Sequence, residues 1–103
     1  MIAVDFDGTI IKHPPNISIE EVFTYDPIEG AAKVISYLVK CGHRLYICTN
    51  RIAKEHKLIR KWLKTHGFPK MRVTNKKLPG TRIYIDDRAL RFTNWEDISK
   101  YLQ

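Results

Sequence analysis

Short apolar runs alternate with segments of helical periodicity, and this alternation limits the fold more than any other feature of the chain. Three runs read as strands, Ile2–Val4, Leu45–Cys48 and Ile83–Ile85, and residues 71–73 form a weaker candidate. Strands that alternate with helices are typical of a parallel sheet covered by helices on both faces. We therefore expect an α/β fold, a three-layer Rossmann-like parallel sheet, as one domain over residues 1–103.

Capping residues set the expected ends of the helices. Asp26-Pro27 predicts a helix start, since Asp caps and Pro favours the first turn, and Cys41-Gly42 predicts its end. A second helix is expected over residues 52–65 and a third from Thr93 or Asn94 to Leu102. The residues expected on the inner face of the second helix are Leu58, Ile59, Trp62 and Leu63.

Charge and cysteine content narrow the partners and the compartment. The net charge of +7 favours anionic partners, namely phosphorylated metabolites, nucleic acid or an acidic protein. Cys41 and Cys48 show no metal-ligand spacing and are expected to be small buried hydrophobes in a reducing cytoplasm. The sequence shows no signal peptide and no apolar run of membrane length, so we expect a cytoplasmic protein that does not bind a membrane.

Polar residues follow three of the predicted strands at the point where each strand ends. Asp5 and Asp7 follow the first strand, Thr49 the second, and Asp86-Asp87 the last. Because the carboxyl ends of parallel strands lie at one edge of the sheet, these side chains should converge there. Four carboxylates in one pocket repel one another, and a hard cation such as Mg²⁺ relieves that repulsion. The sequence therefore predicts a metal site at this edge.

The same residues can transfer a phosphoryl group. Asp5 can attack phosphorus, and Asp7 can protonate the leaving oxygen and later deprotonate a water molecule. Gly8 allows the backbone to approach a phosphate, and Thr49 offers a hydroxyl group. A lysine from the Lys76-Lys77 pair can neutralise the transferring group.

The motif DFDGT, then Thr49, a lysine and finally IYIDD resembles the haloacid dehalogenase superfamily of aspartate-nucleophile phosphatases over essentially the whole chain. The resemblance implies Asp5 as nucleophile and Mg²⁺ ligand, and Asp7 as general acid and base with its carbonyl on the metal. Asp86 would be a further metal ligand, with Asp87 close by or reaching the metal through water. Lys77 is preferred as the site lysine, with Lys76 as the alternative. The residues expected to contact the phosphoryl group are Gly8, Thr9, Thr49, Asn50 and Lys77.

The resemblance also implies a phosphatase without the cap domain that most relatives carry. Residues 12–25 are long enough only for a flap, and one helix fills the interval after Thr49. Members without a cap tend to act on macromolecules or take a lid from a neighbouring subunit. His13, next to Pro14-Pro15, is the histidine expected to overhang the site. Arg51 and Arg88 each follow a strand end and are expected to pair with a site carboxylate more than to touch substrate.

Three classes of function remain open at this stage. The leading one is a Mg²⁺-dependent phosphatase that forms an aspartyl phosphate, with a small phosphorylated metabolite favoured over a nucleotide, nucleic-acid end or phosphoprotein. A phospho-acceptor signalling module is the second, although no Asp ends the Leu45–Cys48 strand. A nucleic-acid binder without turnover is the third, and it has no need of the Asp5 and Asp7 pair.

Overall fold

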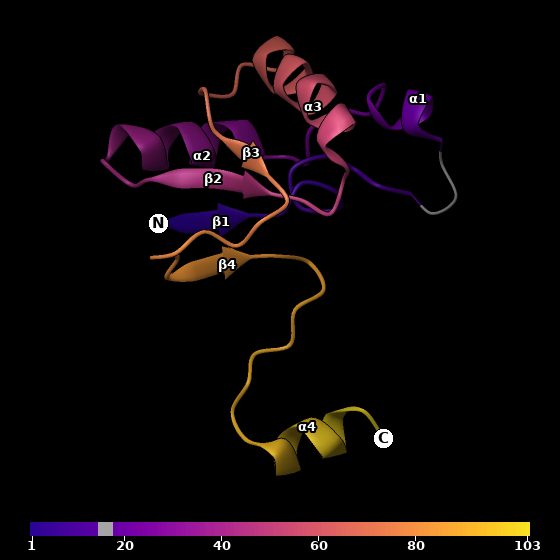
Figure 1. The fold of residues 1–103 in the computed structure, drawn as a ribbon, viewed down its shortest axis with the longest axis vertical. Coiled ribbons are helices and arrows are strands. Elements are labelled where there is room, and N and C mark those ends of the chain that lie inside the picture. Colours follow the sequence, from indigo (N-terminus) through magenta and orange to yellow (C-terminus); the bar gives the residue numbers. More distant parts are fainter. Residues whose placement is uncertain (15–17) are drawn as a thin grey trace.

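A four-stranded parallel sheet organises the chain in the computed structural model, which describes residues 1–14 and 18–103 (Figure 1). The elements are β1 (Ile2–Val4), α1 (Ile19–Val22), α2 (Ala31–Lys40), β2 (Leu45–Cys48), α3 (Ala53–Thr65), β3 (Val73–Thr74), β4 (Ile83–Ile85) and α4 (Trp95–Tyr101). The predicted α/β fold with a parallel sheet and no cap domain is confirmed for the described residues.

The strand order β3-β2-β1-β4 places β1 in the interior of the sheet. Ile2 pairs with Leu45 on one side and with Ile83 on the other, and all neighbouring strands run parallel. The carboxyl ends of β1, β2 and β4 therefore lie along one edge, as the sequence predicts. The strand expected at residues 71–73 lies slightly later, at Val73–Thr74.

Helices α2 and α3 pack on one face of this sheet. Val4, Ile47 and Val73 are register partners whose side chains share that face, because side chains alternate along a strand. They form one apolar cluster with α2 and α3, whose contributions are Ile35, Ile59, Trp62 and Leu63. Leu58, expected on the inner face, is instead exposed and borders the stripe that the helix buries. The core is thus concentrated between two helices and the strands β1 to β3.

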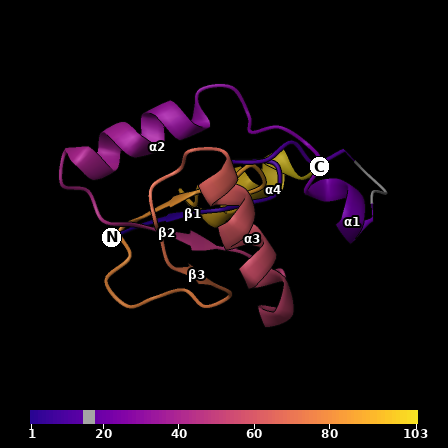
Figure 2. The ribbon, with the colours of Figure 1, turned by 90° about the horizontal axis from the view of Figure 1, so that it is seen from above.

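The opposite face of the sheet is covered by a loop. Residues 75–82 cross from β3 to β4 without a helix, and Figure 2 shows this segment on the side of the strands away from α2. The hydroxyl group of Tyr46, which is buried on that face, accepts a hydrogen bond from the Leu78 N–H (3.1 Å) and lies 2.6 Å from Thr81 Oγ1. A loop therefore forms the layer that was expected to be helical.

Two expectations in the N-terminal half are wrong. The helix expected to begin at Asp26-Pro27 begins at Ala31, because Pro27 instead forms an antiparallel bridge with Ile11. Part of the loop expected over residues 12–25 is helix α1, with the Ser18 side chain accepting from the Glu21 N–H. Val22 of α1 is fully buried, so this segment is anchored in the core. Pro15 of the predicted flap lies outside the described residues.

The C-terminal part differs from the rest of the molecule. All three residues of β4 are exposed, although the strand is apolar. An extended segment then leads to α4, which lies away from the sheet in Figure 1 and has no buried residue. Asn94 caps α4 through its side chain, as one of the two predicted alternatives. Cys41 is exposed and Cys48 is half-buried, so the expectation that both are buried hydrophobes is wrong.

Candidate active site

Three of the four predicted site carboxylates converge at the edge of the sheet. Oxygen atoms of Asp5, Asp86 and Asp87 all lie within 4.8 Å of one another. The cause is the pairing of β1 with β4, which continues one residue further through the hydrogen bond from Asp5 N–H to the Ile85 carbonyl (2.9 Å). Carboxylate oxygens in a tight group are the ligand type that Mg²⁺ takes, so the donor set fits a hard divalent cation.

The carboxyl group of Asp5 shows the electrostatic cost of this grouping. Its pKa is raised to about 6, first by burial and then by repulsion from the carboxylate of Asp86, with Asp87 adding to the shift. The backbone N–H of Phe6 acts in the opposite direction. A cation next to these oxygens would favour the charged form of Asp5, since opposite charge lowers the pKa of an acid.

Gly8 brings the backbone of the β1 loop against Asp87. Its φ of 82° lies in the left-handed region, which glycine adopts without strain. A Cβ at this position would overlap the carboxylate of Asp87. Glycine is therefore suited to this position for two reasons: it allows the turn after Asp7, and it allows the two acidic loops to approach closely.

Asp7 lies outside the carboxylate group and is held by other partners. Arg51 donates to both of its oxygens, from Nε (2.8 Å) and from Nη2 (2.8 Å), and its Nη1 binds Glu55 (2.8 Å). His13 Nδ1 is 3.2 Å from Asp7 Oδ1. The expected pairing of Arg51 with a site carboxylate is thus observed, and His13 lies beside the site as expected. A metal contact through the main-chain carbonyl of Asp7 stays a prediction.

A cavity of about 280 Å³ opens beside the carboxylates. Its lining residues are Ala3, Asp5, Cys48, Asn50, Lys77, Tyr84, Ile85 and Asp86. Lys77 lines it, with Nζ 5.4 Å from the centre of the Tyr84 ring, whereas Lys76 is not among the lining residues. Of the two candidate lysines, the geometry favours Lys77.

Thr49 is the more enclosed of the two predicted threonines. Thr49 is buried, and its Oγ1 accepts the backbone N–H of Arg51 (3.2 Å). It does not line the cavity, although the neighbouring Asn50 does. Thr9 Oγ1 is buried without a hydrogen-bond partner among the described residues. Thr49 therefore shapes the turn after β2, while Asn50 faces the open space.

Two lining residues were not expected at the site. Tyr84 was read only as part of a strand, but alternation along β4 places it on the face of Ala3, beside the cavity. Cys48 immediately precedes Thr49, and its place at a strand end was the signal that could have identified it. Burial raises the pKa of the Cys48 thiol. Its Sγ points to the Lys76 carbonyl at 3.7 Å, which links β2 to the lysine loop.

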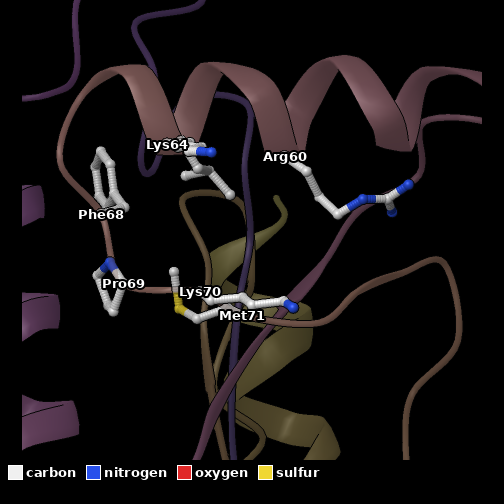
Figure 3. Close-up of a pocket in the computed structure, with 7 residues that line it drawn as sticks. Arg60, Lys64, Phe68, Pro69, Lys70 and Met71 are labelled. Carbon is white, nitrogen blue, oxygen red and sulfur yellow. The ribbon is translucent and has the colours of Figure 1, made fainter.

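A second cavity, of about 290 Å³, lies at the C-terminal end of α3 (Figure 3). Figure 3 labels Arg60 and Lys64 of α3 and, from the segment that follows, Phe68, Pro69, Lys70 and Met71; Leu63 of α3 also lines the cavity. Its lining includes no carboxylate, hydroxyl, thiol or imidazole group. Of these two cavities, the one beside the carboxylates therefore has the groups that can act as nucleophile or acid.

Comparison with known proteins gives a fold without a function. Neither a protein-family model nor a curated protein matches the chain. Its structure is similar to that of a protein from Bacteroides thetaiotaomicron described as a conserved protein, with a TM-score of 0.65 and 26% sequence identity over 98% of this chain and 87% of that one. Among the described residues, no helix has the length and apolarity that a membrane crossing requires.

Proposed function

We propose that this chain is a phosphoric monoester hydrolase, a small capless member of the haloacid dehalogenase superfamily that uses Asp5 as its nucleophile. The observation that carries the proposal is the meeting of Asp5 with Asp86 and Asp87 beside a cavity that Lys77 also lines. Carboxylates that can hold a cation, with the ammonium group of Lys77 close by, suit a substrate that carries negative charge. Mg²⁺ held by these three carboxylates would neutralise charge on the phosphoryl oxygens.

Three side chains at the site have a defined role in this proposal: those of Asp5, Lys77 and Asn50. A carboxylate oxygen of Asp5 attacks phosphorus, the bond from phosphorus to the leaving oxygen breaks, and an aspartyl phosphate forms. The ammonium group of Lys77 and the amide of Asn50 orient the phosphoryl group from the cavity wall. Water then attacks phosphorus, and the Asp5 carboxylate is released together with inorganic phosphate.

Asp7 moves the protons in both steps. As a carboxylic acid it gives a proton to the leaving oxygen, and as a carboxylate it takes one from the attacking water. In the structure both of its oxygens accept from Arg51, and His13 is within 3.2 Å. We infer that Arg51 holds the side chain of Asp7 in place and that Asp7 turns from it to reach the substrate. The exposed His13 imidazole is placed to deliver the proton that Asp7 then carries.

The openness of the site favours a small phosphorylated metabolite or a terminal phosphate as substrate. The carboxylate cavity has room for a phosphoryl group and a few further atoms, and no cap domain covers it in the described part of the chain. A phospho-acceptor module, the alternative, would be phosphorylated on Asp5 and would keep the phosphate. The presence of Asp7 two residues away favours turnover, since it supplies the base that hydrolysis needs.

The test is hydrolysis of an aryl phosphate by the full chain with and without Mg²⁺. We expect Mg²⁺-dependent turnover that falls by about 10³-fold or more in Asp5→Asn, because the amide cannot act as nucleophile. Lys77→Ala should lose about 10²-fold. Lys76→Ala is the matched control, since it removes the same charge one residue away and should stay near the native rate.

Two results would contradict the proposal. Turnover that persists in Asp5→Asn would remove the nucleophile and the mechanism with it. A stoichiometric and stable phosphate on Asp5, formed from a small phosphodonor and not released, would establish the phospho-acceptor module instead.

A further inference from the structure

Exposed apolar side chains are concentrated in the C-terminal part of the chain. Of the twelve large hydrophobic residues exposed in the described part of the chain, eight lie from β4 onward. They are Ile83, Tyr84, Ile85, Leu90, Phe92, Trp95, Tyr101 and Leu102. This is less than a quarter of the sequence, so the concentration marks a surface that has no cover in the single chain.

The single chain is also more open than its size requires. Its accessible surface is 7794 Å², whereas a compact monomer of 12.1 kDa exposes about 6,000 Å². Its radius of gyration is 14.8 Å, compared with about 13 Å for a compact domain of this length. The excess surface, about 1,800 Å² per chain, is of the size that a stable dimer buries.

One of the two uncovered surfaces is a face of α4. Trp95, Ile98 and Leu102 follow one another at helical spacing and lie on the same side of the helix. Phe92 extends that face, with its ring centre 5.5 Å from that of Trp95. Trp95 is 75% exposed, so the largest apolar side chain of α4 is mostly uncovered in its own chain.

The other uncovered surface is β4. Ile83 and Ile85 are 54% and 41% exposed, and their side chains point to the face on which Ile2 and Val4 lie. A cavity at the start of this strand borders Ile83 and is lined by three basic residues, His43, Arg44 and Arg82. The first turn of α4 carries Glu96 and Asp97. The apolar face of α4 therefore matches the apolar surface of β4, and the acidic first turn of α4 is opposite in charge to the basic residues near the start of β4.

We propose that two copies of this chain form a dimer by exchanging residues 88–103, so that each α4 packs on Ile83 and Ile85 of the other copy. Residues 86–94 extend away from the sheet in Figure 1 and carry α4 beyond its own body. Each chain carries both uncovered surfaces, the α4 face and β4. In a two-fold symmetric dimer each α4 covers β4 of the other copy, so both surfaces of both chains are buried. The burial of the excess surface of both chains falls in the range of permanent dimers, about 2,000 to 5,000 Å².

This proposal is independent of the phosphatase mechanism. The exchanged segment follows Asp86-Asp87, which stay beside Asp5 of their own chain. Dimerisation requires no cation and no substrate, and its measurement needs neither.

The experiment is sedimentation velocity of the full chain from about 1 to about 100 µM, a range that covers common dimer affinities. We expect a dimer for the native chain. Trp95→Glu should raise the dissociation constant at least about tenfold, because it places a charge in a buried contact. Tyr37→Glu is the matched control, since Tyr37 is similarly exposed, at 64%, but lies on α2. It should leave the dimer unchanged.

Ile83→Glu tests the acceptor surface and should also weaken the dimer at least about tenfold. Trp95 fluorescence, taken as native minus Trp95→Phe, should shift to shorter wavelength on dimerisation. A monomer at all concentrations would overturn the proposal, whether Trp95 is then exposed or shielded by its own chain. A dimer indifferent to Trp95→Glu, or sensitive to it but not to Ile83→Glu, would also overturn it.

Discussion

The loop after β1 and the loop after β4 both bring carboxylates to the same edge of the sheet, but only the first is anchored in the core. In the β1 loop, Phe6, Ile10 and Ile11 are almost fully buried, and the Phe6 carbonyl accepts from the N–H groups that follow in the turn. In the β4 loop, Asp86 and Asp87 are exposed. Its hydrogen bond from the Arg88 N–H to Asp86 Oδ1 (2.7 Å) is local.

The difference indicates how the candidate site is ordered. The position of Asp5 is set by packing that exists before any ligand binds. Asp86 is positioned by the short pairing of β4 with β1 and by whatever binds between the carboxylates. One half of the site is therefore preorganised, and the other half depends on a ligand or on the segment that follows it.

The largest expected contrast is between the acids of the two loops. Asp5→Asn should abolish turnover at every Mg²⁺ concentration, because the nucleophile is lost. Asp86→Asn should instead raise the half-saturating Mg²⁺ concentration about 10- to 100-fold, with much of the rate recovered in excess Mg²⁺. The measurement is aryl phosphate hydrolysis as a function of Mg²⁺ concentration.

Glu29→Gln is the control for the removal of one exposed negative charge. Its half-saturating Mg²⁺ concentration should match that of the native chain. If Asp86→Asn is equally inactive at all Mg²⁺ concentrations, the two loops do not have the different roles that their burial indicates.

The contact between the loops gives the next prediction. Gly8→Ala should destabilise the fold by about 1–2 kcal/mol from its positive φ alone, and by more because the new Cβ meets Asp87. Gly67→Ala is the matched control, since Gly67 has a φ of 77° and a Cβ added there would meet no atom within 4 Å. Thermal unfolding of both variants measures the difference. Equal destabilisation of the two variants would mean that the β4 loop moves away from the new Cβ with no loss of stability.

The placement of Asp5 and Asp86 at one edge of the sheet was predictable from the sequence because it follows from strand direction. Parallel strands place all of their carboxyl ends at that edge. The pairing of β1 with β4 then brings the two acids together. The strand Leu45–Cys48 and the cap at Asn94 were predictable for the same kind of reason, since each rests on a local pattern.

Long-range pairings were not predictable in the same way. Pro27 reads as a helix start, but it bridges to Ile11, and no local pattern contains that partner. The exposure of β4 could not be predicted from its apolar sequence, because periodicity cannot tell whether a helix will cover the strand. The sequence places Asp7 in one group with Asp5, Asp86 and Asp87, and only the tertiary structure shows that Asp7 lies outside this group and pairs with Arg51. These differences arise from tertiary contacts, and so does the division between the two loops.

The smallest expected effect concerns the charge of Asp5 in the absence of a cation. Its pKa rises from 3.8 to about 6 on folding, so the folded state prefers the protonated acid. Stability that depends on this proton is present below pH 4 and is lost as the pH rises to about 6. Because Asp5 is partly exposed, solvent screening limits the loss to about 1 kcal/mol, or about 4–8 °C in melting temperature.

Asp5→Asn carries no such charge, so the difference in melting temperature between variant and native chain isolates this effect from all other acids. In metal-free buffer the variant should melt close to the native chain at pH 4 and above it at pH 7. Mg²⁺ at pH 7 should raise the melting temperature of the native chain more than that of the variant, because a cation offsets the repulsion from Asp86. A difference that is the same at both pH values would mean that the carboxyl group of Asp5 is solvated and away from Asp86 in the folded chain, as it would be if the β4 loop moved away. The preorganised half of the site would then stand alone until substrate binds.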